Sequence, residues 1–249
     1  MTPHDLKPDV LSTSDAASPL GDHRPEAAPA VLAIDIGGSH VKIRTQAVEE
    51  ERRVESGPTM TAAEMVAAVK SLADGWHYDV VSIGYPGPVH DNRPSRDPAH
   101  LGPGWAGHDF AQSFGRPVKV VNDALMQAIG SYRGGRMLFL GLGTGLGMAL
   151  ILEGVCHPLE AGHLPYRKGR SFEDYVSEAA REARGKKKWR DAVADVAQRL
   201  DAAFLPDEVV IGGGNVEHLK TLPPRCRRGD NALAFLGGFR LWTEPKLVL

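Results

Sequence analysis

Three glycine-bearing turns, each directly after an apolar run, constrain the fold of this chain more than any other feature. They occupy 35–39 (DIGGS), 141–147 (GLGTGLG) and 212–215 (GGGN). Glycine lets the backbone adopt positive φ and approach a ligand closely, and a turn after a strand exposes N–H groups that can bind phosphate. One such turn by itself more often only reverses the chain. Three in this order predict an α/β protein with an anion site at its strand ends.

The segments between these turns repeat a loose βββαβα order twice. Short apolar or alternating runs predict strands at 31–35, 40–48, 80–84, 118–121, 137–153 (a hairpin) and 208–211. Thr61 and Glu64 form a capping box that begins the clearest helix of the first half. Helical spacing recurs near 172–184 and 188–204. No short-period repeat is present, which excludes a solenoid or a propeller.

Composition excludes several classes of protein. The formal charge of −2, from 29 basic and 31 acidic residues in 249, gives no global field for nucleic acid or an anionic membrane. Cys156 and Cys226 cannot make a disulfide framework or a four-cysteine zinc site, which favours a reducing compartment. Residues 1–30 have no signal-peptide core and are predicted to be a disordered tail. We expect a cytoplasmic protein with neither nucleic-acid nor membrane partners.

Other candidate motifs fail on inspection. The uncharged stretch 137–152 is short for a membrane span and is interrupted by glycines, so two buried strands explain it better. No G-x-x-x-x-G-K-[ST] motif occurs. The G-x-G-x-x-G match at 102–107 contains Pro103 and follows no strand, which indicates an accidental match.

The ordered motifs resemble the ROK branch of the actin-like sugar kinases, and within it the polyphosphate glucokinases. The matching strings are IDIGGSHVK (34–42), GYPGPV (84–89), VVNDALMQAIGSYRGGRMLFLGLGTGLG (120–147), LEAGHLPYRKGRSFEDYV (159–176), GKKKWR (185–190), VVIGGGN (209–215) and GDNALAFLGGFRLW (229–242). The resemblance implies an α/β, actin-like (ribonuclease H-like) fold with lobes 31–121 and 122–249 around a central cleft. It also implies phosphorylation of glucose to glucose 6-phosphate with polyphosphate, and possible use of ATP.

Phosphoryl transfer to a sugar needs a carboxylate to accept the hydroxyl proton, groups that neutralise charge, and usually a divalent metal. The resemblance makes Asp123 the general base. Asp123 follows a predicted strand and precedes a helix, whose dipole we expect to keep it ionised. The residue alone also fits a helix N-cap. The sugar contacts implied by the resemblance are Asn122, Glu160, His163, Glu173, Pro86, Gly87 and His100. His100 departs from the family pattern, which has Asn immediately before this Leu.

On the donor side, the resemblance places Mg²⁺ or its bound water at Asp35, a residue type also common in turns. The implied phosphate or nucleotide contacts are Asp35, Gly37, Gly38, Ser39, Lys42, Gly143, Thr144, Gly145, Gly212, Gly213 and Gly214. Many ROK proteins bind zinc through a cysteine cluster and the histidine that corresponds to His163. No cysteine cluster follows His163, so we expect no structural zinc.

The densest basic stretch contains Lys186, Lys187, Lys188 and Arg190. By itself, such a stretch is typical of a solvated helix end. The resemblance of GKKKWR to the polyphosphate enzymes implies a site for the extended donor, whose affinity should fall steeply with salt.

Two alternatives stay open. One is an ATP-dependent glucokinase or glucomannokinase of the same family. The other is a sugar-responsive regulator or non-catalytic sugar-binding protein, but repressors of the family carry an N-terminal helix-turn-helix for which 1–30 is too short and too Pro-rich. The resemblance also implies a homodimer, in which the apolar residues within 233–242 could form an interface or equally the core.

Overall fold

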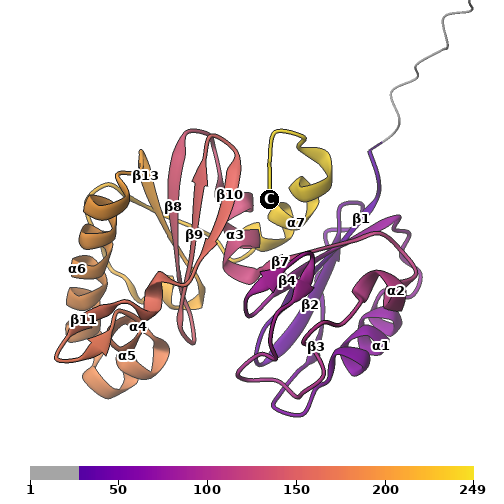
Figure 1. The fold of residues 1–249 in the computed structure, drawn as a ribbon, viewed down its shortest axis with the longest axis horizontal. Helices are drawn as coiled ribbons and strands as arrows, with labels where there is room; N and C mark the ends of the chain where they lie inside the picture. The colour runs from indigo at the N-terminus through magenta and orange to yellow at the C-terminus, as the bar shows by residue number, and fades with distance from the viewer. Residues whose placement is uncertain (1–27) are drawn as a thin grey trace, which may run out of the picture.

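The computed structural model describes residues 28–249, so the expected tail 1–30 lies almost wholly outside the described residues. Two five-stranded sheets dominate the molecule (Figure 1). The first has the order β3-β2-β1-β4-β7, with β1 Val31–Ile36, β2 His40–Thr45, β3 Arg52–Glu55, β4 Val80–Tyr85 and β7 Val118–Asn122. The second has the order β10-β9-β8-β13-β14, with β8 Arg136–Leu142, β9 Leu146–Leu152, β10 Val155–Leu159, β13 Glu208–Gly212 and β14 Cys226–Arg228.

The two sheets share one design. In each, an antiparallel meander of three strands is extended by parallel strands next to its first member: β4 beside β1, and β13 beside β8. The doubled order expected from the sequence is therefore confirmed. The carboxyl ends of β1, β4 and β7 lie at one edge of their sheet, as do those of β8 and β13, so the glycine turns come together at strand ends.

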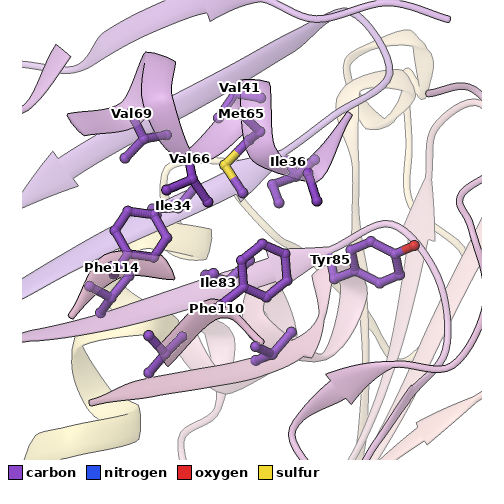
Figure 2. Packing of buried hydrophobic residues seen from close by; sticks show 14 of the residues in the cluster. Ile34, Ile36, Val41, Met65, Val66, Val69, Ile83, Tyr85, Phe110 and Phe114 are labelled. Carbon is purple, nitrogen blue, oxygen red and sulfur yellow. The ribbon is translucent and has the colours of Figure 1, made fainter. Parts of the chain in front are cut away.

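One face of the first sheet packs on helices α1 (Ala62–Leu72) and α2 (Phe110–Phe114). Figure 2 shows the apolar side chains that fill this interface. The expected capping box begins α1: the Thr61 hydroxyl accepts from Glu64 N at 3.3 Å, and the Glu64 carboxylate accepts from Thr61 N at 2.8 Å. Because successive side chains of a strand point to opposite faces, alternate residues of β1 and β2, Ile34 and Val41 among them, face this core.

The other face of the first sheet packs on helix α7 (Leu233–Thr243), which comes from the far end of the described chain. Phe235 and Phe239 of α7 contact Val31, Ala33 and Val80. The division into lobes 31–121 and 122–249 stays a prediction, but α7 completes the core of the first sheet although it follows the second sheet in sequence.

Helix α3 (Asp123–Ser131) lies between the two sheets and crosses α7 closely (Figure 1). A Cβ on Gly130 would overlap the Leu233 carbonyl, and a Cβ on Gly237 would overlap the Met126 carbonyl. The Arg240 guanidinium donates to the carbonyls of Ile129 and Tyr132 and so caps the end of α3. This crossing fixes the direction in which the first turn of α3 points.

The outer face of the second sheet is covered by α4 (Glu173–Val176), α5 (Glu178–Arg184) and α6 (Lys186–Phe204). The helical patterns expected near 172–184 and 188–204 are thus confirmed, the first as α4 and α5 and the second as α6. The expected hairpin at 137–153 is confirmed as β8 and β9, joined by a turn at 143–145. In the described part of the chain, no helix is long and apolar enough to cross a membrane.

Several short elements have no counterpart in the sequence expectations. Among them are β5 Val89–His90, β6 Arg93–Pro94, β11 Pro165–Arg167, β12 Arg170–Ser171 and the 3₁₀ turns Ala161–His163 and Gly214–His218. The strand expected over 40–48 ends earlier, at Thr45. Pairs of strands this short lack the length of alternation that a sequence pattern requires.

The crossing of α3 and α7 predicts a large effect of one methyl group. Gly130→Ala should lower the free energy of unfolding by about 3 kcal/mol, because two backbones would have to separate and the better helix propensity of alanine offsets only about 1 kcal/mol. Urea unfolding of the purified variant measures this loss. Gly214→Ala is the control, since its Cβ would come no nearer than 3.9 Å to another residue. Equal midpoints for Gly130→Ala and the native protein would show that the helices do not depend on this contact.

Candidate functional site

A cavity of about 490 Å³ lies between the two sheets, where their strand ends meet the first turn of α3. Most of the site residues expected from the sequence line it. These are Asp35, Gly37, Gly38, Lys42, Pro86, Gly87, His100, Asn122, Asp123, Gly143, Thr144, Gly145, Glu160, His163, Glu173 and Gly213. Residues spread over nearly the whole described chain are therefore brought to one place.

The remaining expected residues lie outside the lining. Ser39, Gly212 and Gly214 are next to residues that line the cavity. Lys186, Lys187 and Lys188 are exposed on the first turn of α6. Arg190 is half-buried and its Nε donates to the His218 carbonyl at 2.6 Å, so this side chain is already held within the protein.

Asp123 is the first residue of α3, and its neighbour Asn122 is the N-cap. The Asn122 Oδ1 accepts from Leu125 N at 3.1 Å, while its Nδ2 donates to the Gly87 carbonyl at 3.2 Å. The alternative that Asp123 serves as the N-cap is therefore wrong. The Asp123 carboxylate accepts from Ala124 N at 2.7 Å, and Asp123 lines the cavity. Asn122, in turn, ties the start of the helix to the loop at 86–87.

The charge state of Asp123 differs from the expectation. Desolvation, followed by the negative charges of Asp35 and Glu160, raises the pKa of Asp123 to about 7, against the hydrogen bond from Ala124 N. We had expected the dipole at the helix start to keep Asp123 ionised, but desolvation has the larger effect on its pKa. Burial also raises the pKa of Asp35, although the Lys42 ammonium opposes this shift. Two carboxylates that disfavour each other's charge in one cavity form a place where a cation stabilises both.

This pair fits Mg²⁺ better than a metal held wholly by protein. Magnesium usually binds one or two carboxylates together with water and substrate phosphates. No group of three or more His, Cys, Asp or Glu side chains within residues 28–249 is placed to hold a metal. Asp35 is therefore the residue that could hold such an ion, directly or through water, and the absence of structural zinc stays a prediction.

The turn between β8 and β9 has a different hydrogen-bonding capacity from the one expected. Gly143 N donates to Gly145 O at 3.1 Å, and its carbonyl accepts from Asn215 Nδ2, so the Gly143 N–H is not available to a ligand. Leu146 N donates to the Glu173 carboxylate at 2.8 Å. The N–H groups of Thr144 and Gly145 have no partner among the described residues. These two can bind an anion, while Glu173 holds the turn in place.

The rim of the cavity carries exposed polar side chains. Glu160 precedes the 3₁₀ turn that His163 ends, and their side chains lie 3.6 Å apart, Oε2 to Nε2. On the opposite side, His100 packs over Gly38, where a Cβ would lie 3.2 Å from that of His100. Donors and acceptors of this kind suit a polyhydroxylated ligand.

Sequence reasoning missed two polar residues that line the cavity, Gln127 and Asn231. Gln127 lies four residues after Asp123 on α3 and therefore on the same helix face. It is also the one amide in a helix whose other members are mostly apolar. That spacing from Asp123 was the signal that could have identified it.

The ROK family pattern matches residues 31–167. This chain belongs to the ROK family. Among its relatives is the polyphosphate glucokinase of Mycobacterium tuberculosis, 27% identical over 206 residues that make up 74% of this chain and 77% of that one. The bifunctional enzyme NanE/NanK of Brucella melitensis is 33% identical over 138 residues, which span 50% of this chain but only 27% of that protein.

A solved structure extends the likeness to nearly all of the described fold. The inorganic polyphosphate/ATP-glucomannokinase of Arthrobacter sp. strain KM superposes with a TM-score of 0.73 at 25% identity and covers 87% of this chain and 98% of its own. The actin-like fold expected from the sequence is thereby confirmed. This ROK protein has relatives whose names describe sugar kinases.

The raised pKa of Asp123 makes its charge a cost to folding. Because the pKa in the folded protein, about 7, exceeds the ordinary aspartate value of 3.8, stability should fall as pH rises through this interval. Asp123→Asn removes the charge and should raise the Tm by a few degrees at pH 8.5 but not at pH 4. Thermal unfolding in chelator at the two pH values measures the difference.

Asp174→Asn is the control of opposite sign. Hydrogen bonds from Ser171 N and Ser171 Oγ lower the pKa of Asp174, so its charge favours folding and the variant should lose stability at pH 8.5. A lower Tm for Asp123→Asn at pH 8.5 would contradict the assigned electrostatics of the cavity.

Proposed function

We propose that this protein phosphorylates glucose to glucose 6-phosphate, with inorganic polyphosphate as the donor, ATP as a second possible donor and Asp123 as the general base. The observation that carries the proposal is the position of Asp123: it begins a helix inside the cleft, faces the cavity and has a pKa of about 7. The names of the M. tuberculosis and Arthrobacter relatives support glucose and polyphosphate as substrates.

On the acceptor side, the sugar hydroxyl attacks the terminal phosphorus of the donor and its proton passes to the Asp123 carboxylate. The bond between that phosphorus and the bridging oxygen breaks, and the shortened donor leaves with the electron pair. A carboxyl with a pKa near 7 is both ionised in part at neutral pH and basic enough to accept this proton. Asn122 bonds both the Gly87 carbonyl and the start of α3. The position of the base relative to the proposed sugar-binding loop at 86–87 is therefore fixed.

On the donor side, the free N–H groups of Thr144 and Gly145 and the Lys42 ammonium supply positive potential to the transferred group. The turn at 37–38 closes the other side of the cavity. Mg²⁺ held by Asp35 would neutralise charge on the donor phosphates when bound.

In this proposal, the lysines at the start of α6 bind the part of the polyphosphate chain that extends beyond the cavity. A helix N-terminus disfavours positive charge, so Lys186, Lys187 and Lys188 do not stabilise the helix that contains them. Helix α5 connects them to the phosphate turn: Glu178 N donates to Gly143 O at 3.0 Å, and α5 ends at Arg184, two residues before Lys186. Its seven residues span roughly 10 Å, a distance that a chain of several phosphates can cover.

ATP as the main donor is the second candidate, because the Arthrobacter protein is described as using both donors. The measurement that separates the two is glucose 6-phosphate formation with Mg²⁺, glucose and either long-chain polyphosphate or ATP. Absence of product with both donors would overturn the proposed function. Cytoplasmic localisation and a homodimer stay predictions.

Replacement of the base gives the test of mechanism. Asp123→Asn should lower kcat by about 10²–10⁴-fold, because the amide accepts no proton, while the variant stays folded. Steady-state kinetics beside a thermal unfolding curve check both statements, with Asp174→Asn as a carboxylate control outside the cavity. Near-native turnover by Asp123→Asn would remove Asp123 from the role of base.

Replacement of the lysines tests the extended donor site. The triple variant Lys186→Ala, Lys187→Ala, Lys188→Ala should raise the KM for long-chain polyphosphate about tenfold or more and make it less dependent on salt, since fewer counterions are exchanged. The KM for ATP should stay within about twofold, a difference below 0.5 kcal/mol. A variant with Lys220→Ala and Lys246→Ala, two exposed lysines elsewhere, is the control. An unchanged salt dependence in the triple variant would assign these lysines to solvent alone.

A further inference from the structure

Gln127 and Asn231 meet at one end of the cavity, between α3 and the segment that leads into α7. Gln127 is 8% exposed, and its Nε2 donates to Asn231 Oδ1 at 2.7 Å and to the Asp230 carbonyl at 3.3 Å. A backbone carbonyl can only accept, so this contact fixes which end of the Gln127 amide carries the hydrogens. The pair is a connection between two elements and a part of the cavity wall.

Each amide keeps one polar atom for a ligand. Gln127 Oε1 accepts no hydrogen bond from any described residue, and it is not among the buried polar atoms that lack a partner, so it is accessible from the cavity. Asn231 Nδ2 donates to no described residue and lies beside Gly214, where a Cβ would be 3.9 Å away. The pair therefore offers one acceptor and one donor side by side.

This combination does not suit a phosphate chain. At neutral pH, the oxygens along polyphosphate only accept hydrogen bonds, so Oε1 of Gln127 would face them without a proton between. A hydroxyl both donates and accepts hydrogen bonds, and an amino group donates them, so either group can donate to Gln127 Oε1. A ligand group at this place should be neutral and should carry an O–H or N–H.

The position separates this group from the sugar acceptor. Gln127 follows Asp123 by one turn, about 6 Å along the axis of α3, and it lies beside Gly212, where a Cβ would be 3.4 Å from the Gln127 Cδ. The rim residues Glu160 and His163 lie instead at the start and end of the 3₁₀ turn that follows β10. The neutral group therefore belongs to the phosphoryl donor, on the side away from the phosphate that is transferred.

We infer that Gln127 and Asn231 are specificity-determining residues that bind the nucleoside part of ATP through a hydroxyl or amino group, and that polyphosphate makes no use of them. The inference rests on the proposed function only in taking the cavity as the site of a phosphoryl donor. It divides the site into a phosphate part, shared by both donors, and a nucleoside part that ATP alone reaches.

ATP and inorganic tripolyphosphate form a matched pair of probes, because they contain the same number of phosphates and differ by the adenosine. Calorimetric titration of the full chain with each probe, in Mg²⁺ and without glucose, gives a Kd that does not depend on turnover. Gln127→Leu should raise the Kd for ATP about tenfold, as expected for loss of one hydrogen bond in a cavity. The Kd for tripolyphosphate should change less than about twofold. Asn231→Ala, at an exposed position, should act in the same direction.

Gln198→Leu is the matched control, since Gln198 is exposed on α6 and the substitution is the same; neither Kd should change. Equal weakening of both probes by Gln127→Leu and Asn231→Ala would overturn the inference, because the pair would then act through the phosphate part or through the fold. Unchanged ATP binding in both variants, or failure of the native protein to bind ATP, would also overturn it.

Activity assays keep this outcome apart from that of the proposed function. A native protein that forms no glucose 6-phosphate, but whose ATP affinity falls selectively in the two variants, would lose the proposed function and keep the inference. A native protein that uses polyphosphate, and whose variants bind ATP as it does, would keep the proposed function and lose the inference.

Discussion

The close crossing of α3 and α7 is the contact on which the rest of the structure depends. Gly130 and Gly237 allow two helix backbones to touch, and the Arg240 guanidinium closes the carbonyl end of α3. Helix α3 packs on the second sheet and α7 on the first, so this single crossing joins the two cores. The start of α3 is thereby aimed into the cleft, which is why a carboxylate at its first position faces the ends of both sheets.

The electrostatics of the cleft follow from that placement. Asp123 and Asp35 come from separate strand ends and share one desolvated region with few fixed positive charges, Lys42 among them. Such an arrangement is unfavourable in the empty protein and becomes favourable when a cation or a proton enters. Stability is given up at the place where chemistry is needed, a relation common in enzymes. The two carboxylates thus destabilise the folded protein by itself and are stabilised when a cation or a proton binds between them.

Much of this organisation could be predicted from the sequence because it rests on local patterns. The capping box of Thr61 and Glu64, the strand ends at Asp35 and Asp123 and the glycine turn at 143–145 all depend on neighbours in the chain. The packing of α7 on the first sheet could not be predicted, since the same apolar residues would serve an interface equally well. Which of Asn122 and Asp123 caps α3 depends on the carbonyl of Gly87, a distant residue. The pKa of Asp123 depends on desolvation and on Asp35, so it follows only from the folded arrangement.

The origin of α7 has a consequence for the order in which the protein is built. Val31, Ala33 and Val80 are buried by Phe235 and Phe239, residues that leave the ribosome roughly 200 positions after the first strand, a separation typical of slow, non-local folding. Until then, the first sheet has one finished face and one apolar face without its cover, although all of its strands have already been synthesised. Emerging chains in such a state are the ones that bind chaperones or associate with each other. Helix α7, which sets the direction of α3 and so of Asp123, is therefore also the last element needed to cover the apolar face of the nascent sheet.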